Sequence, residues 1–189
     1  MRIVAGVHRG RTLVAPKGHS TRPTADRTRQ ALFNVLEHAA WSPGLGGARV
    51  ADLFAGSGAL GLEALSRGAA FCRFIDTDSA AIAAIGENLE TLRLGDRAAA
   101  RRSDAARLAP MGAGAPQFDL VFVDPPYAKG LAELALAGLW GGRWLSDDAL
   151  VVVERAVGEP DLDAPAFEVL DTRSWGAARV WFLRFRSAR

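Results

Sequence analysis

The chain has 189 residues, of which 49% are hydrophobic, so it is long enough to bury the core of a single domain. A single cysteine excludes an internal disulfide, and no apolar run is long enough for a membrane span or a secretory signal, so we expect a soluble, cytoplasmic protein. The formal net charge is only +2, yet residues 1–34 hold seven Lys or Arg and one Asp, which indicates either a basic segment that meets a polyanion or a solvated surface.

The first part of the chain predicts a small β element followed by a helix. Two short β-prone runs, residues 2–7 and 11–15, are separated by a turn and read as a hairpin. A stripe of apolar residues at helical spacing follows over residues 25–40, with Thr24 as a candidate N-cap. We therefore expect a basic N-terminal β extension over residues 1–22, ahead of the main domain at 23–189.

From residue 48 onward the pattern becomes strand, glycine turn and helix, repeated. Such alternation predicts an α/β, doubly wound sheet of seven mostly parallel strands, and a turn at Gly176 makes the last two strands an antiparallel hairpin. The expected strands are residues 48–54, 70–76, 98–104, 118–124, 149–155, 166–175 and 178–186, and the expected helices are residues 58–68, 79–92 and 129–140.

A glycine loop follows the first of these strands. Gly56, Gly58 and Gly61 have the spacing G-x-G-x-x-G, and Asp76 lies 20 residues after Gly56. This arrangement is typical of nucleotide-type ligands bound beyond the carboxyl ends of parallel strands, although a tight turn alone would also explain it.

Asp52, at the end of the first strand, discriminates between cofactors. A carboxylate beside a pyrophosphate costs roughly 4 kcal/mol at an effective dielectric constant of about 20. S-adenosylmethionine (SAM) has no phosphate and carries a sulfonium and an ammonium group, so Asp52 favours SAM over NAD and opposes an NAD oxidoreductase. Asp76 is placed to accept from ribose hydroxyls, and Asp104 either accepts from the adenine amino group or caps a helix.

The fourth strand ends in Asp124-Pro125-Pro126-Tyr127, the most specific motif of the chain. Two prolines fix the backbone in an extended turn, so the Pro125 carbonyl and the Asp124 carboxylate can accept from an exocyclic amine. Tyr127 is placed to stack on an extruded base. The alternative is a rigid turn without chemistry.

Together, "DLFAGSGALGLEALSRGA" and "VDPPY" resemble SAM-dependent amino-methyltransferases that act on nucleobases. "TRPTADRTRQALFNVL", residues 21–36, and the leading "RIVAGVHRGRTL" resemble the RsmD family of bacterial 16S ribosomal RNA (guanine-N2)-methyltransferases. The resemblance covers essentially the whole chain. It departs from the family at Asp76, where Glu is commoner, and at Gln30, where an acid is commoner.

The resemblance implies a Rossmann-like methyltransferase that modifies guanine 966 of 16S rRNA within the 30S subunit or its assembly intermediates. It implies Asp124, Pro125, Pro126 and Tyr127 as the catalytic loop. The implied SAM pocket consists of Thr24, Asp52, Phe54, Ala55, Gly56, Gly58, Gly61, Asp76, Thr77, Asp104 and Ala105.

Under this resemblance, the basic residues of the N-terminal part and Lys129, just after the catalytic loop, would contact rRNA phosphates, and the affinity for rRNA would depend on salt. Arg27 and Arg29 cannot both serve, because residues two apart on a helix face different ways. We expect a monomer. We also expect no metal site, since the three His and one Cys have no metal-ligand spacing. Other readings are a DNA adenine-N6 methyltransferase and a non-catalytic RNA-binding assembly factor. The candidate RNA contacts are Arg9, Arg11, Arg22, Arg27, Arg29 and Lys129.

Overall fold

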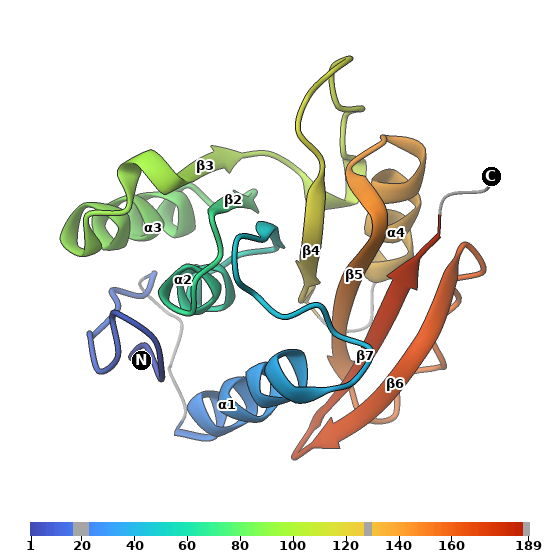
Figure 1. Cartoon of the computed structure of the whole chain (residues 1–189), viewed down its shortest axis with the longest axis horizontal. Coiled ribbons are helices and arrows are strands. Elements are labelled where there is room, and N and C mark those ends of the chain that lie inside the picture. Colours follow the sequence, from blue (N-terminus) through green and yellow to red (C-terminus); the bar gives the residue numbers. More distant parts are fainter. Residues whose placement is uncertain (17–22, 127–129, 187–189) are drawn as a thin grey trace.

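A computed structural model describes residues 1–16, 23–126 and 130–186 of the chain, without the side chains of residues 23–25 (Figure 1). The helices are α1 (Pro23–His38), α2 (Ala59–Ser66), α3 (Ser79–Leu92) and α4 (Leu131–Gly141), with short 3-10 turns η1 (Gly95–Arg97) and η2 (Ala105–Arg107). The strands are β1 (Arg49–Leu53), β2 (Phe71–Asp76), β3 (Ala98–Arg102), β4 (Phe118–Val123), β5 (Leu145–Ala156), β6 (Phe167–Trp175) and β7 (Ala178–Phe185).

The strands form one seven-stranded sheet in the order β3-β2-β1-β4-β5-β7-β6. β1 pairs in parallel with both β2 and β4, while β7 pairs antiparallel with β5 and β6. This confirms the predicted mostly parallel sheet with an antiparallel C-terminal hairpin. Because the chain leaves β1 toward β2 on one side and returns to β4 on the other, the carboxyl end of β1 is the topological switch point, where ligands bind in open α/β sheets.

The sheet buries a core of hydrophobic side chains on each face. α1, α2 and α3 cover one face, where Val50 and Phe122 belong to the buried cluster. α4 covers the other, where the neighbouring residues Ala51 and Val123 are buried. Successive strand residues therefore point into different cores, which fixes the direction of every side chain at the strand ends.

Local capping explains where two helices begin. α3 starts after Asp78, whose side chain accepts a hydrogen bond from the Ala80 amide at 2.8 Å. α1 begins at Pro23, a residue suited to the first helical position because it has no amide proton to leave unpaired. Thr24 therefore lies within the first turn of α1, and its prediction as the N-cap is wrong.

The N-terminal segment is less regular than expected. Residues 2–15 do not form a full hairpin: Arg2 and Thr12 form one antiparallel bridge, with the Ile3 amide donating to the Arg11 carbonyl at 2.9 Å. Ile3 and Leu13 are nonetheless buried in the α1–α3 core.

The buried carboxylate of Glu63 fixes this segment to α2. It accepts from the amides of Val4 and Ala5 at 2.8 and 2.9 Å, so these two backbone groups are satisfied by α2 instead of a partner strand. The predicted boundary at residue 22 lies outside the described residues. Within the described part of the chain, no helix is both long and apolar enough to cross a bilayer.

Candidate active site

Four carboxylates lie at the carboxyl ends of adjacent strands: Asp52 on β1, Asp76 on β2, Asp124 directly after β4, and Glu154 on β5. Each follows a residue buried in the α4 core (Ala51, Ile75, Val123 and Val153, respectively). All four therefore point toward the face covered by α1, α2 and α3. The sequence motifs indicated three of these acids, whereas Glu154 was missed because no motif marks it.

Asp52 is fully buried, with 1% of its surface exposed, and it accepts a hydrogen bond from the Gly61 amide at 2.9 Å. Burial raises the pKa of Asp52 to about 7; the Gly61 hydrogen bond opposes this shift and the negative charge of Asp76 adds to it. A buried acid with this pKa is partly protonated at neutral pH. A cation brought beside it would favour the carboxylate form.

Asp76 organises the glycine loop. One carboxylate oxygen accepts from the Gly56 amide at 2.8 Å and the other accepts from the Asp78 amide at 2.9 Å. A carboxylate oxygen has a second lone pair, so Asp76 retains acceptor capacity for hydroxyl groups such as those of a ribose.

The three glycines of the loop have different physical roles. Gly56 and Gly58 have φ values of +54° and +74°, a conformation that favours glycine. A Cβ on Gly61 would lie 2.3 Å from Cε1 of Phe74 and 2.5 Å from Sγ of Cys72, so Gly61 permits close packing of α2 on β2. A Cβ on Gly56 would meet no atom within 4 Å, which leaves Gly56 as the glycine that borders open space.

This finding corrects part of the sequence interpretation. The absent side chain of Gly58 points toward Ile85 and Phe74, not toward a ligand. The amide of Gly61 is occupied by Asp52. Gly58 and Gly61 therefore shape the loop from within, and only Gly56 offers a close approach to its backbone.

Phe54 lies between β1 and the loop with φ +58°, an unusual conformation for a non-glycine residue. Next to it, the Ala55 amide donates to the Ile75 carbonyl at 3.1 Å, which extends the β1–β2 pairing by one step. The backbone therefore leaves the sheet after Ala55 and turns sharply at Gly56. Strain of this kind at a strand end is typical of functional sites.

Asp124 is half-buried, Pro125 is buried and Pro126 is exposed. Burial raises the pKa of the Asp124 carboxyl well above its usual range, and the negative charges of Glu154 and Asp52 raise it further. Burial also raises the pKa of Glu154. Within the ranges that the structure describes, neither Asp124 nor Glu154 has a hydrogen-bond or ion-pair partner on its carboxyl group. Tyr127 lies outside those ranges.

The remaining candidates for the pocket differ in their surroundings. Asp104 accepts from the Ala106 amide at 2.9 Å and so caps η2, as the alternative reading expected, while its other oxygen lies 3.8 Å from Arg107. Thr77 is exposed and Ala105 is buried. Thr24 lies on α1, near the start of the helix, and its side chain is outside the described part of the structure.

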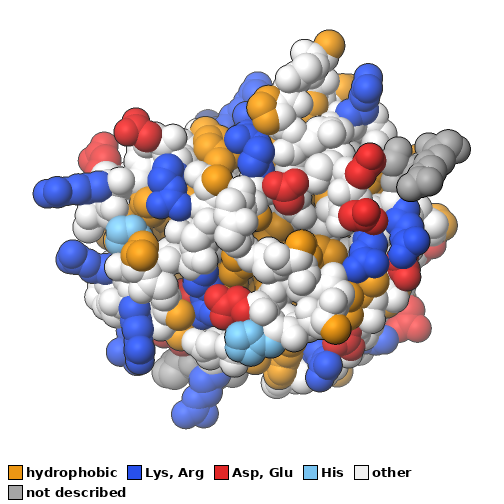
Figure 2. Space-filling model, in the orientation of Figure 1, with side chains coloured by type: hydrophobic (Ala, Val, Ile, Leu, Met, Phe, Trp, Pro, Cys, Tyr) orange, Lys and Arg blue, Asp and Glu red, His pale blue; other side chains and the backbone are white. Residues whose placement is uncertain are grey.

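The basic residues divide into surface and structural groups. Arg9, Arg11 and Arg27 are exposed, and Figure 2 shows Lys and Arg side chains along the left margin, over α3 and the N-terminal segment. Arg29, by contrast, is only 5% exposed; its guanidinium contacts Asp26 at 2.8 Å and Glu63 at 3.6 Å. Its prediction as an RNA contact is wrong, because it closes a buried ion-pair network. Arg22 and Lys129 lie outside the described residues.

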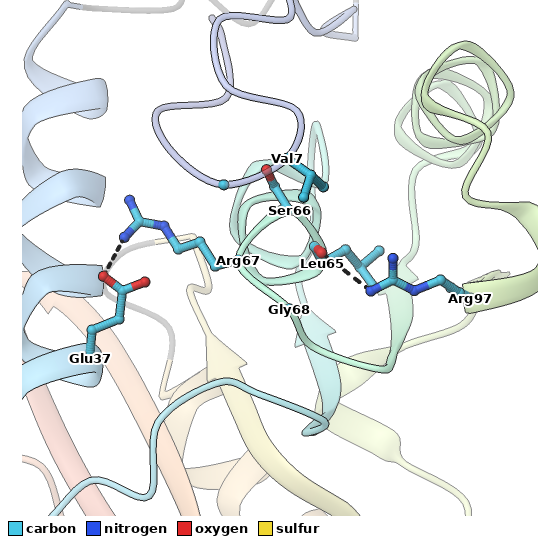
Figure 3. Close-up of a pocket in the computed structure, with 8 residues that line it drawn as sticks. Val7, Glu37, Leu65, Ser66, Arg67, Gly68 and Arg97 are labelled. Carbon is cyan, nitrogen blue, oxygen red and sulfur yellow. Dashed lines mark hydrogen bonds and ion pairs between the residues drawn. The ribbon is translucent and has the colours of Figure 1, made fainter.

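A hollow of about 510 Å³ lies near the C-terminal end of α2, away from these acids. It is lined by Val7, Ser66 and Arg67, and its charged side chains are already paired: Arg67 contacts Glu37 at 2.9 Å, and Arg97 donates to the Leu65 carbonyl (Figure 3). Because its charges are satisfied within the fold, it offers less chemistry than the acids at the strand ends. In the described residues, no group of three His, Cys, Asp or Glu side chains is arranged for a metal ion.

Comparison with known proteins places this arrangement in a family. Residues 1–184 match a family described as conserved hypothetical protein 95. The chain is 42% identical to ribosomal RNA small subunit methyltransferase D of Escherichia coli K12 over 157 residues, 83% of this chain and 75% of that protein. It is 34% identical to the protein of the same name in Haemophilus influenzae over 177 residues, 93% of this chain and 89% of that protein.

Solved structures agree. The structure of Escherichia coli yhhF superposes with a TM-score of 0.82 at 36% identity, covering 100% of this chain and 99% of that one. Magnesium protoporphyrin IX methyltransferase of Synechocystis, solved with bound SAM, is 17% identical with a TM-score of 0.64 over 90% of this chain and 87% of that one; this likeness concerns the fold alone. The sheet order, the glycine loop and the extent of these matches lead to one conclusion: the chain belongs to the RsmD family of ribosomal RNA small subunit methyltransferases.

Proposed function

We propose that the chain transfers a methyl group from SAM to the exocyclic N2 amine of a guanine in 16S rRNA. The observation that carries the proposal is the placement of Asp52 and Asp124 on one face of the sheet, beside the glycine loop at the switch point. The names of the Escherichia coli and Haemophilus influenzae relatives support small-subunit rRNA as the substrate.

The described residues fit SAM better than a dinucleotide. When bound, SAM supplies an electrophilic methyl on a sulfonium centre. Asp52 has a raised pKa and no cation in contact with its carboxylate in the described structure, so a positively charged ligand relieves its buried charge. Asp76 offers its remaining lone pairs to the ribose, and the Gly56 turn leaves room for backbone contact.

Asp124 and the Pro125 carbonyl act on the amine. The lone pair of a guanine N2 amine is delocalised into the ring, which makes the nitrogen a poor nucleophile. Acceptors on its two N–H bonds favour a pyramidal nitrogen with its lone pair directed at the methyl carbon. As the N–C bond forms, the C–S bond breaks and leaves a neutral thioether. The nitrogen becomes cationic and is stabilised by Asp124, which then takes the departing proton and passes it to water.

The finer assignment rests on the family resemblance. It comprises guanine 966, a 30S subunit or assembly intermediate as the substrate particle, a monomeric enzyme and a cytoplasmic location. Tyr127 and Lys129 complete the proposed base and phosphate contacts. Exposed Arg9, Arg11 and Arg27 supply further phosphate contacts.

The test uses tritiated SAM with naked 16S rRNA, small-subunit particles lacking the modification, and DNA in parallel, followed by identification of the labelled nucleoside. We expect N2-methylguanosine from the RNA substrates. The Asp124→Ala variant should lose transfer yet retain S-adenosylhomocysteine binding by calorimetry. Label in N6-methyladenine of DNA, or binding of nicotinamide dinucleotide in place of S-adenosylhomocysteine, would overturn the proposal.

A further inference from the structure

A second carboxylate lies beside the proposed catalytic acid, and the reaction outlined above does not use it. Val123 on β4 pairs with Val153 on β5, so the next residues of the two parallel strands, Asp124 and Glu154, stand side by side. Both follow residues of the α4 core and therefore point to the opposite face, toward α1–α3.

Glu154 has no structural partner that explains it. It is half-buried on a strand whose neighbours Val152 and Val153 are buried hydrophobic residues. Across the sheet it pairs with Val180 of β7, which is also buried. Among the described residues its carboxyl group has no hydrogen bond or ion pair, unlike the next residue, Arg155, which contacts Glu133 at 2.7 Å. A carboxylate held among apolar neighbours without a protein partner is stabilised by a ligand that donates hydrogen bonds to it.

The two acids together match the hydrogen-bonding edge of guanine. On that edge guanine presents one N1–H and two N2–H donors next to each other, and ionised carboxylates are acceptors only. The N2 amine of guanine lies between N1–H, a donor, and N3, an acceptor, so a carboxylate beside Asp124 finds a hydrogen-bond partner only on the N1 side. The geometry points to Glu154 as a specificity-determining residue that accepts the N1–H of the target guanine; this inference rests on the proposed function.

This arrangement would select the base as well as hold it. In adenine and in 2-aminopurine, N1 is an unprotonated acceptor and would face the Glu154 carboxylate with lone pair against lone pair. Sites that hydrogen-bond a substrate N–H reject analogues that lack it, because the acceptor is then left buried and unpaired. Burial and then the negative charge of Glu154 raise the pKa of Asp124, and guanine donors that face the two acids would offset the cost of keeping both ionised.

The experiment compares two target bases in otherwise identical small-subunit particles, reconstituted with 16S rRNA carrying either guanosine or 2-aminopurine riboside at the target position. Both bases have the N2 amine, but only guanine has N1–H. We measure kcat/KM for the wild type, Glu154→Gln and Asp147→Asn. Asp147 is an exposed acid on the same strand and is the control for loss of one negative charge.

We expect the wild type to prefer guanosine by at least about tenfold, in line with the discrimination given by one good base contact. Glu154→Gln keeps an acceptor oxygen but replaces a charge-assisted hydrogen bond by a neutral one, so kcat/KM on guanosine should fall about tenfold. Its amide can donate to N1 of 2-aminopurine, so the preference should fall toward one. Asp147→Asn should behave as the wild type, and the affinity of Glu154→Gln for S-adenosylhomocysteine should be unchanged.

Two results would overturn the role of Glu154 and leave the proposed function standing. One is an equal loss of kcat/KM on both bases in Glu154→Gln, which indicates a structural effect. The other is a wild type that does not prefer guanosine. If the wild type methylates neither RNA, the proposed function itself has failed.

Discussion

Asp52 is a buried acid of the proposed site, and its burial opposes stability. Its folded-state pKa, about 7, is above the ordinary value of 3.8, so protonation favours the folded state. That stabilisation is complete at pH values below the ordinary pKa and is lost as the pH rises through about 7. By linkage the loss reaches roughly 4 kcal/mol in the free energy of unfolding.

Asp52→Asn should therefore be more stable than the wild type, by about 4 kcal/mol at about pH 8 and about half of that at about pH 5.5, because an amide oxygen still accepts from Gly61 without carrying charge. Urea unfolding at the two pH values measures this. The same variant should lose more affinity for SAM than for S-adenosylhomocysteine, which has no sulfonium charge. A stability difference that does not grow with pH would contradict the burial argument.

Asp124 should give the methyl-transfer rate a pH dependence. Only the ionised carboxylate can accept a hydrogen bond from the amine and later take its proton. Burial raises the pKa of Asp124, and the negative charges of Glu154 and Asp52 raise it further. Single-turnover rates should therefore decline as the pH falls through that raised pKa, well above the range in which an ordinary Asp titrates. In Glu154→Gln the decline should move to lower pH, since one neighbouring negative charge is gone. A rate that stays constant down to about pH 5 would exclude Asp124 as the titrating group.

At the level of elements, the contact between α2 and β2 depends on Gly61. Gly61→Ala would place a methyl group against Phe74 and Cys72, at separations that real contacts do not show. We expect a loss of about 1–3 kcal/mol in unfolding free energy, typical of an overpacked core, together with weaker SAM binding because Asp52 is tied to the same residue.

Gly86→Ala is the matched control for this substitution. Gly86 lies within α3 and a Cβ there meets no atom within 4 Å, so alanine should stabilise the helix by about 0.5–1 kcal/mol. Chemical denaturation of both variants beside the wild type decides the matter. Equal effects at the two glycines would mean that the contact between α2 and β2 tolerates a side chain at Gly61.

Over the whole molecule, the local hydrophobic and turn patterns of the sequence predicted most helices and strands but few of the long-range contacts between them. The apolar runs of β1, β2, β4 and β7 predicted the sheet, because buried strands need continuous hydrophobic sequence. β5 begins at Leu145, four residues before its expected start, because Leu145 pairs with Phe118. A register shift follows this pair, and the polar residues after Leu145 gave no sign of a strand there.

The errors at the site have the same origin. The sequence pattern indicated that Arg29 is a surface charge on a basic segment. Its burial depends on long-range contacts with Glu63 on α2 and with the Arg2 carbonyl, which no local pattern indicates. Glu154 gives no local signal, and only the pairing of β4 with β5 brings it beside Asp124. The motifs therefore predict which residue types act, while sheet register determines which further residues join them.

The distribution of charge over the molecule gives a last prediction. Arg9 and Arg11 are exposed and lie on the N-terminal segment that Glu63 fixes to α2. Their positive charges therefore lie on an anchored part of the surface. Replacing both by Ala should weaken binding to 16S rRNA and reduce the slope of log affinity against log salt by about one for each phosphate that the variant no longer neutralises. The control replaces Arg173 and Arg186, exposed residues paired with Asp171 and Glu168 near the β6 edge. If both double variants change the slope equally, the N-terminal segment holds no special contact, because general charge alone would then account for the binding.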